Sequence, residues 1–108
     1  DVDFLKLEIF VPRTHLSDIR LALQAVDAGH IGKYDSCLSY SPVIGCFRPL
    51  AGTDPFIGSE GEVCEVEEYK VEVTIRRENL KKTMDAVKKA HPYEEPVINV
   101  IALFGVGL

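Results

Sequence analysis

The sequence predicts an α+β sandwich of the ferredoxin-like type, in which two helices cover one face of an antiparallel sheet. The first observation is the order of the apolar patterns, which runs strand, helix, strand pair, strand, helix, strand. The second is the change of apolar spacing between period two and the helical period along the chain. We expect a single domain over residues 1–108, because this length leaves room for one hydrophobic core.

The first half of the pattern is a strand followed by a helix. Residues 3–11 alternate between apolar and polar side chains, and Pro12 ends the predicted strand by removing a backbone donor. Thr14 is the expected N-cap of the helix, and Gly29 is expected in the left-handed conformation after its last turn. The apolar stripe of this helix consists of Leu16, Ile19, Ala22, Leu23 and Val26.

The middle of the chain is rich in glycine and proline. Residues 34–40 and 46–50 are predicted to pair as an extra hairpin, with the turn at residues 41–45. Residues 51–61 lack periodicity, but Phe56 and Ile57 offer apolar surface to bury, which favours an ordered loop.

The second half begins with a long strand pattern over residues 63–75. Its phase changes at Glu67 and Glu68, which predicts a bulge or a sharp bend. A helix is predicted over residues 78–90, followed by a strand over residues 97–104 that is apolar enough to be buried on both faces. We therefore expect copies of the chain to cover the helix-free face of the sheet, as a homo-oligomer.

Composition excludes several classes of partner. Seventeen acidic against twelve basic residues give a net charge of −5, which disfavours nucleic-acid binding. No apolar run approaches the ~20 residues that cross a bilayer, and no secretion signal is visible at the start, so no membrane partner is expected. Three cysteines do not make a disulfide framework, which favours a reducing, cytoplasmic location.

Two groups of residues resemble a known family. Residues 29–37 (Gly-His-Ile-Gly-Lys-Tyr-Asp-Ser-Cys) form the first group, together with residues 47–50 and 55–58. Residues 91–96 (His-Pro-Tyr-Glu-Glu-Pro) form the second group. Together they resemble the CutA/PII-like inserted domain of the YqfO (NGG-interacting-factor-like) family, and the second group also resembles the His-Pro-Tyr-Glu segment of CutA, the divalent-cation-tolerance protein. The resemblance covers nearly the whole chain.

The resemblance implies the ferredoxin-like fold and, because CutA and PII proteins are typically trimers, a trimer. The host domain of the YqfO family, whose histidines and carboxylates hold two metals, has no counterpart here. Its metal site therefore does not carry over, and the chain looks like a free-standing relative of the insert.

Histidines are the first candidates for a binding site. His91, with a carboxylate such as Glu94, could meet a divalent metal or a polar group of a ligand; the alternative is a rigid proline turn. His30 could join Cys37 and His91 as a metal ligand, or could instead bond the last carbonyls of the preceding helix.

Arg48 is a further candidate, because an arginine in an apolar hairpin requires a carboxylate or an anionic ligand. A salt bridge to a neighbouring subunit is the alternative. The complete set of predicted ligand-binding residues is His30, Tyr34, Arg48, His91, Tyr93 and Glu94, and the predicted metal ligands are His30, Cys37 and His91.

Two further groups have an ordinary structural interpretation. Cys37 and Cys46 lie on the two strands of the predicted hairpin, where buried free thiols are the default. The acidic run over residues 60–72, which includes Glu68, is interpreted as a solvated edge.

The predicted function is a non-catalytic homo-oligomeric module, with a trimer favoured over a dimer, that binds a small ligand or a divalent metal at subunit clefts. One alternative is a metal-assisted hydrolase, which needs several ligands in one place and an open position for water. Another is an interaction module that docks on a separately encoded protein through Leu21 and the loop containing Phe56 and Ile57.

Overall fold

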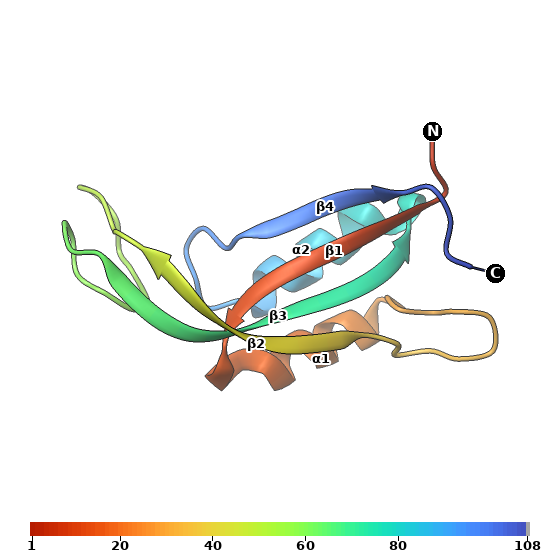
Figure 1. Cartoon of the computed structure of the whole chain (residues 1–108), viewed down its shortest axis with the longest axis horizontal. Helices are drawn as coiled ribbons and strands as arrows, with labels where there is room; N and C mark the ends of the chain where they lie inside the picture. The colour runs from red at the N-terminus through yellow and green to blue at the C-terminus, as the bar shows by residue number, and fades with distance from the viewer. Residues whose placement is uncertain (108) are drawn as a thin grey trace.

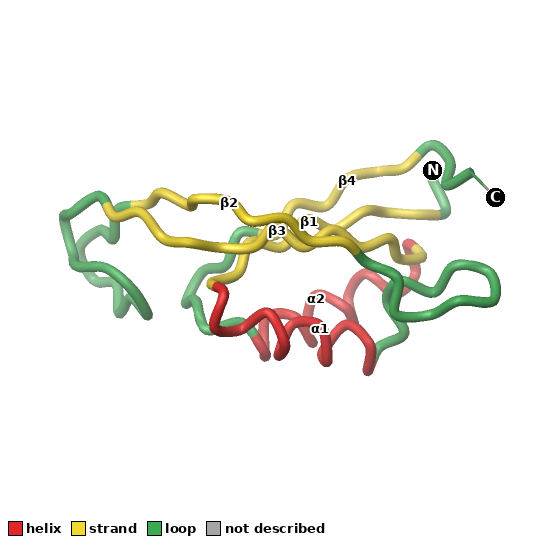
Figure 2. The backbone as a smooth tube through the Cα atoms, turned by 60° about the horizontal axis from the view of Figure 1, so that its bottom comes forward, coloured by secondary structure: helices red, strands yellow, loops and turns green. Residues whose placement is uncertain are grey.

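The computed structural model describes residues 1–107 and shows the predicted α+β sandwich. Four antiparallel strands form one open sheet in the order β2-β3-β1-β4, and both helices lie on one side of it (Figures 1 and 2). The strands are β1 (Phe4–Pro12), β2 (Ser39–Phe47), β3 (Cys64–Arg76) and β4 (Ile98–Leu103), and the helices are α1 (Leu16–Ala25) and α2 (Leu80–Ala90). The N-terminus and the segment that follows β4 lie at the same end of the sheet (Figure 1).

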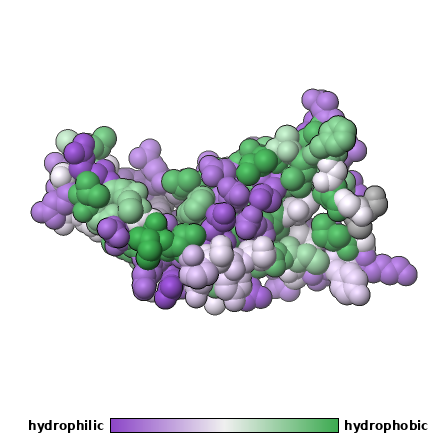
Figure 3. All heavy atoms as spheres, viewed as in Figure 1, coloured by the Kyte–Doolittle hydropathy of each residue, from purple (hydrophilic) through white to green (hydrophobic). Residues whose placement is uncertain are grey.

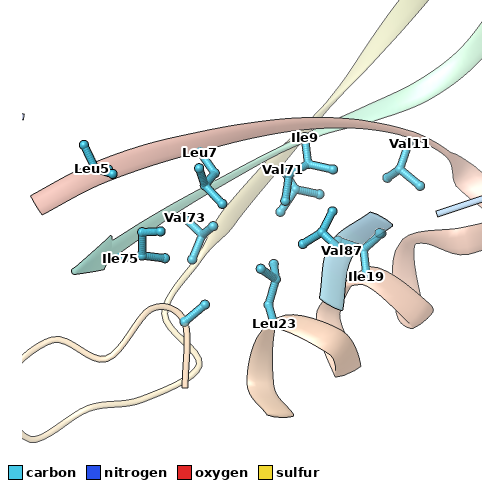
Figure 4. Packing of buried hydrophobic residues seen from close by; sticks show 11 residues of the cluster. Leu5, Leu7, Ile9, Val11, Ile19, Leu23, Val71, Val73, Ile75 and Val87 are labelled. Carbon is cyan, nitrogen blue, oxygen red and sulfur yellow. The ribbon is translucent and has the colours of Figure 1, made fainter. Parts of the chain in front are cut away.

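The hydrophobic core lies between the sheet and the two helices. Alternate residues of β1 and β3 point toward the helices and are almost fully buried (Figure 4). They meet the apolar stripe predicted for the first helix, so the period-two pattern and that helical pattern are confirmed together. The buried apolar residues are Leu5, Leu7, Ile9, Val11, Ile19, Leu23, Ala28, Val71, Val73, Ile75 and Val87.

The start of the first helix differs from the prediction. A single 3-10 turn, η1 (Arg13–His15), follows Pro12 and leads directly into α1, and no side chain caps either segment. The Thr14 hydroxyl lies 2.8 Å from His15 Nδ1 instead. The predicted Thr14 cap is therefore wrong, because a 3-10 turn at this end already uses part of the backbone that a cap would satisfy.

The end of α1 also differs. Asp27, at φ 57°, takes the left-handed position that was predicted for Gly29. Its N–H donates to the Gln24 carbonyl at 3.1 Å, and the Ala28 N–H donates to the Leu23 carbonyl at 3.0 Å. This pair of bonds is a Schellman motif, and aspartate is one of the few residues besides glycine that tolerate its left-handed position.

Gly29 has a different role, at a close approach between three segments. Its N–H donates to the Thr74 carbonyl of β3, and its carbonyl accepts from the Cys37 N–H, both at 3.0 Å. The φ of Gly29 is 82°, and a Cβ atom there would collide with the Cys37 backbone. Glycine is needed at this position for both conformation and space.

The extra hairpin predicted in the middle of the chain is wrong. Residues 41–45 are not a turn but the interior of β2, which runs without interruption from Ser39 to Phe47 along β3. Pro42 is tolerated because β2 is an edge strand, where one side of the backbone needs no sheet partner. Cys37 and Cys46 consequently lie near opposite ends of one extended strand rather than side by side.

Of the bulge or sharp bend predicted at Glu67 and Glu68, the bulge is absent. The register of β3 with β2 is continuous, and β2 and β3 curve together beyond the helices instead (Figure 1). The last partner of β3 in β1 is Pro12, opposite Glu68. Beyond that point the helix side of β3 is uncovered and its opposite side is buried, which inverts the apolar pattern without an extra residue.

The helix-free face is polar at its centre, contrary to the expectation of an apolar face. The Lys6 ammonium lies 2.7 Å from a carboxylate oxygen of Glu72 and 3.3 Å from one of Glu8, and the Asn99 amide donates to Glu8. Figure 3 shows hydrophilic residues across the middle of this view. The reason is that Leu5, Leu7, Ile9 and Val11 of β1 point to the helix side, whereas Lys6 and Glu8 lie between Phe4 and Phe10 on the helix-free side.

Both edge strands expose apolar side chains. The predicted burial of the last strand on both faces is wrong for a single chain, since Val100 and Ile101 of β4 are 42% and 38% exposed. Tyr40 and Ile44 of β2 are 45% and 58% exposed. Part of the exposed apolar surface therefore lies along the edges of the sheet, and the rest lies on the loops and on α1, as at Leu21.

We expect Gly29→Ala to lower the free energy of unfolding by about 2–4 kcal/mol, because it combines a left-handed conformation with a backbone collision. Gly32→Ala is the matched control, since Gly32 has φ 58° but nothing within 4 Å of an added Cβ. The control should lose only about 1 kcal/mol. Urea unfolding of both variants measures the difference, and equal losses would refute the role of the Cys37 contact.

Candidate functional site

The main cavity lies where the β2–β3 end of the sheet meets two loops. It has a volume of about 510 Å³, and its walls come from residues 45–57, from the turn at residues 93–97, and from single side chains of β1, β3 and β4. Three of the predicted ligand-binding residues line it, namely Arg48, Tyr93 and Glu94. The cavity therefore brings together predicted residues from two segments that are far apart in the sequence.

Aromatic side chains form most of the apolar wall. The ring centroid of Tyr93 lies 5.9 Å from that of Phe47 and 6.3 Å from that of Phe56. Phe56 also packs edge-on against His15 at 5.4 Å, which holds the loop against the start of α1. Phe56 nevertheless remains 50% exposed and Ile57 is only partly buried, so the expected burial of these two side chains by the loop is incomplete in a single chain.

A single carboxylate lies inside the cavity. Glu68 is only 4% exposed, and one of its oxygens accepts a 2.7 Å hydrogen bond from the Tyr93 hydroxyl. Burial, followed by the contact with Glu68, raises the pKa of Tyr93. The phenol therefore stays protonated and remains the donor of this bond. Among the described residues, Glu68 has no basic partner within salt-bridge distance.

Gly45 makes room for this carboxylate. It lies on β2 two residues from the position paired with Glu68, and a Cβ atom at Gly45 would collide with Glu68 Oε1. Its φ is not in the left-handed region, so space rather than conformation explains glycine here. Glu68 is thus held from one side by Tyr93 and fits only because the other side is empty of a side chain.

His91 lies behind the cavity and fixes the turn that carries Tyr93. It is 6% exposed; its Nε2 donates to the Phe10 carbonyl at 2.7 Å, and its Nδ1 accepts from the Tyr93 N–H at 3.1 Å. These two partners require the neutral ring with the proton on Nε2. Burial lowers the pKa of His91, in agreement with this neutral form. The ring acts here as a structural clamp, with both nitrogens already engaged.

The loop and the turn are also joined by Glu94. Its carboxylate accepts a hydrogen bond from the Asp54 N–H at 3.3 Å. Arg48 and Glu95 lie on the same rim and are exposed, as is Glu94 itself. Arg48 forms no ion pair with another described residue. The charges at the mouth of the cavity are therefore hydrated, in contrast to Glu68 inside it.

The other predicted residues lie at the opposite end of the molecule, in the loop between α1 and β2 (Figure 1). The Nδ1 of His30 lies 3.0 Å from the Asp27 carboxylate and its Nε2 lies 3.0 Å from the Gly32 carbonyl. Asp27 is the main reason that the pKa of His30 is raised. Tyr34 is 76% exposed, and the Cys37 thiol lies against the Asp35 carbonyl. One chain therefore does not bring His30 and Cys37 together with His91.

No group of three or more histidine, cysteine, aspartate or glutamate side chains within residues 1–107 is placed to hold a metal ion. The metal set of His30, Cys37 and His91 stays a prediction, and it would need residues from more than one chain. The three cysteines Cys37, Cys46 and Cys64 are free thiols.

Sequence reasoning missed Glu68, which it placed on a solvated edge. A signal for Glu68 was present in the alternation of β3. Cys64, Val66 and Glu68 lie on one face of the strand, whereas Val71, Val73 and Ile75 lie on the other. Interpreting that change as a bulge removed Glu68 from the buried set. Gly45 was missed for a related reason, because a glycine near a proline was assigned to a turn.

We expect the free energy of unfolding to fall as the pH drops through about 6.5, the pH at which His91 of the unfolded chain is half protonated. The folded pKa is lower, so the unfolded state binds more protons in this window and stability is lost at a slope of at most about 1.4 kcal/mol per pH unit. His91→Gln removes this component. His30→Gln is the control that keeps it, since the pKa of His30 is shifted in the opposite direction. Urea unfolding from about pH 7.5 to about pH 5.5 measures the slopes, and an unchanged slope in His91→Gln would contradict this account.

Comparison with known proteins supports a relationship over most of the chain. The family model described as CutA1 divalent ion tolerance protein matches residues 41–106. The GTP cyclohydrolase 1 type 2 homolog of Halalkalibacterium halodurans is 43% identical over 102 residues, which covers 94% of this chain and 27% of that protein. The chain therefore spans about a quarter of the length of the curated relatives it matches.

Solved structures agree with this result. A Bacillus cereus protein related to NIF3 has a TM-score of 0.84 and 36% identity, covering 96% of this chain and 26% of that chain. The periplasmic divalent cation tolerance protein CutA from Archaeoglobus fulgidus has a TM-score of 0.71 at 21% identity, covering 96% of this chain and 88% of that chain, which supports the fold alone. The predicted likeness to CutA and to the YqfO/NIF3 proteins is confirmed, and the chain belongs to the CutA1 divalent ion tolerance protein family.

Proposed function

We propose that the chain is a non-catalytic, homo-oligomeric module that binds a small organic ligand in the cavity around Glu68. The observation that carries this proposal is the construction of the cavity, in which one buried carboxylate is surrounded by aromatic rings and closed by two ordered loops. Ligand sites of this kind are concave, mostly apolar, and contain a few fixed polar groups. Glu68, held in place by Tyr93, is such a group.

The homo-oligomer is supported by the edges of the sheet. β2 and β4 each have one unpaired backbone side, and both present exposed apolar side chains. Unprotected edges of this kind favour strand addition by another chain, and β2 of one copy can pair with β4 of the next. When the β2 edge of each copy pairs with the β4 edge of the next, the copies can form a closed ring. A ring of three copies fits the trimer that the resemblance implies.

The location we propose is the cytoplasm, where the free thiols of Cys37, Cys46 and Cys64 are stable. None of the helices within residues 1–107 is long and apolar enough to cross a membrane.

Small-molecule fragments added to the isotope-labelled chain should shift amide NMR signals that cluster around Phe47, Phe56 and Tyr93. Phe56→Ala removes part of the wall and should weaken the binding of such fragments by about tenfold, because an aromatic side chain buries much of the contact area. Phe104→Ala is the control, since Phe104 is fully exposed and lies outside the cavity. Shifts spread evenly over the surface would contradict the ligand site.

Sedimentation velocity should show an assembly of three chains rather than a monomer. Ile101→Lys places a charge on the β4 edge and should shift the assembly toward monomers by at least about tenfold in the dissociation constant. Leu21→Lys is the control, because Leu21 is exposed on α1 and belongs to neither edge strand. A chain that stays monomeric at micromolar concentration would disprove the assembly.

A further inference from the structure

The buried carboxylate of Glu68 has a free position. The Tyr93 hydroxyl donates to Oε2, and no described residue donates a hydrogen bond to Oε1. Oε1 is the oxygen that faces Gly45, and both residues line the cavity. A carboxylate that is 4% exposed and bonded only to a neutral hydroxyl is costly to bury, because most of its hydration is lost without a compensating charge.

The surroundings of Glu68 select for positive charge. The two other carboxylates of the cavity, Glu94 and Glu95, stand at the mouth, and Arg48 is the only basic residue among the lining residues. Arg48 is exposed and forms no ion pair with the described residues, so it does not neutralise the interior. The interior of the cavity therefore contains one negative charge, that of the Glu68 carboxylate, without a positive partner.

The walls indicate what must be attached to that charge. Phe10, Phe47, Phe56 and Tyr93 supply aromatic surface, and aromatic faces attract both apolar groups and cations. A hydrated metal ion would gain little from such walls, because it prefers oxygen ligands and retains its water. An apolar body with one ammonium or guanidinium group matches both the rings and the carboxylate.

We infer that the cavity takes an organic cation, with its charged N–H group donating to Glu68 Oε1 and its apolar body packed among Phe47, Phe56 and Tyr93. This inference names the ligand class of the proposed binding site and therefore rests on the proposed function. The Tyr93 hydroxyl orients the carboxylate toward the cation, and Gly45 provides the space in which the carboxylate lies. The exposed glutamates at the mouth attract the cation without fixing its position.

The test uses three probes with similar apolar bodies and different charges: phenethylammonium, phenethyl alcohol and hydrocinnamate. Isothermal titration gives the affinities, and amide shifts give the site. We expect phenethylammonium to bind at the cavity at least about tenfold more tightly than the alcohol, and hydrocinnamate to bind most weakly.

Two variants locate the charge. Glu68→Gln keeps the shape of the side chain and should reduce the preference for the ammonium over the alcohol by at least about tenfold. Gly45→Ala leaves every charge in place but displaces the carboxylate, and it should reduce the same preference. Glu65→Gln is the matched control, because Glu65 is exposed on the opposite face of β3 and loses the same formal charge.

The outcomes separate the inference from the proposed function. Equal binding of the ammonium and the alcohol at the cavity refutes the ligand class and leaves the ligand site standing, whereas no binding of any probe refutes both. Tighter binding of hydrocinnamate, abolished by Arg48→Gln, would make the site an anion site. If Glu68→Gln instead dissociates the assembly in sedimentation and the wild-type chain excludes the probes, a basic side chain of a second copy fills the cavity and the inference is wrong.

Discussion

The hydrogen bond between the Tyr93 hydroxyl and the Glu68 carboxylate is the interaction on which the arrangement of the site depends. It joins the turn between α2 and β4 to the far part of β3, two segments that are otherwise held by different neighbours. His91 fixes the same turn to β1 from behind through the Phe10 carbonyl. With both anchors in place, Phe56 of the loop after β2 can pack against Tyr93 and complete a cavity.

Most of the fold could be predicted from the sequence, because β1, the helices and the second part of β3 each have one side in the core. Their apolar residues repeat with the period of the element, and that period is unaffected by distant contacts. β2 was missed because it is an edge strand. Pro42 and Gly45 are compatible with an edge strand and also with a turn, and only the pairing with β3 decides between the two.

Less of the site could be predicted, and the reason is physical. Tyr93, Glu94 and Arg48 were identified from their unusual local sequence, yet the residue at the centre of the cavity was not. The surroundings of Glu68 include Gly45 of β2 and Tyr93 of the turn before β4, which lie more than 20 residues away from it in the sequence. His30 and His91 share a residue type but lie at opposite ends of the chain's sheet, where their pKa values are shifted in opposite directions. The identity of a residue as histidine therefore predicts neither its place in the fold nor the direction of its pKa shift.

The polar centre of the helix-free face also changes the basis for assembly. Lys6, Glu8 and Glu72 form a hydrated network there, so a dry interface between sheet faces would bury several charges. Association through the strand edges avoids this cost because backbone groups pair and the charges stay in water. The strand edges, rather than the face of the sheet, therefore provide the physical reason to expect an oligomer.

The collision between a side chain at Gly45 and the carboxylate of Glu68 links two positions that are 23 residues apart in the chain. Each residue alone looks replaceable, since an edge strand tolerates many side chains and an exposed acidic run tolerates many substitutions. The two positions are sterically coupled, so that a larger side chain at position 45 requires a shorter side chain at position 68. Across related sequences the two positions should therefore covary, and the covariation would mark which relatives retain the buried charge.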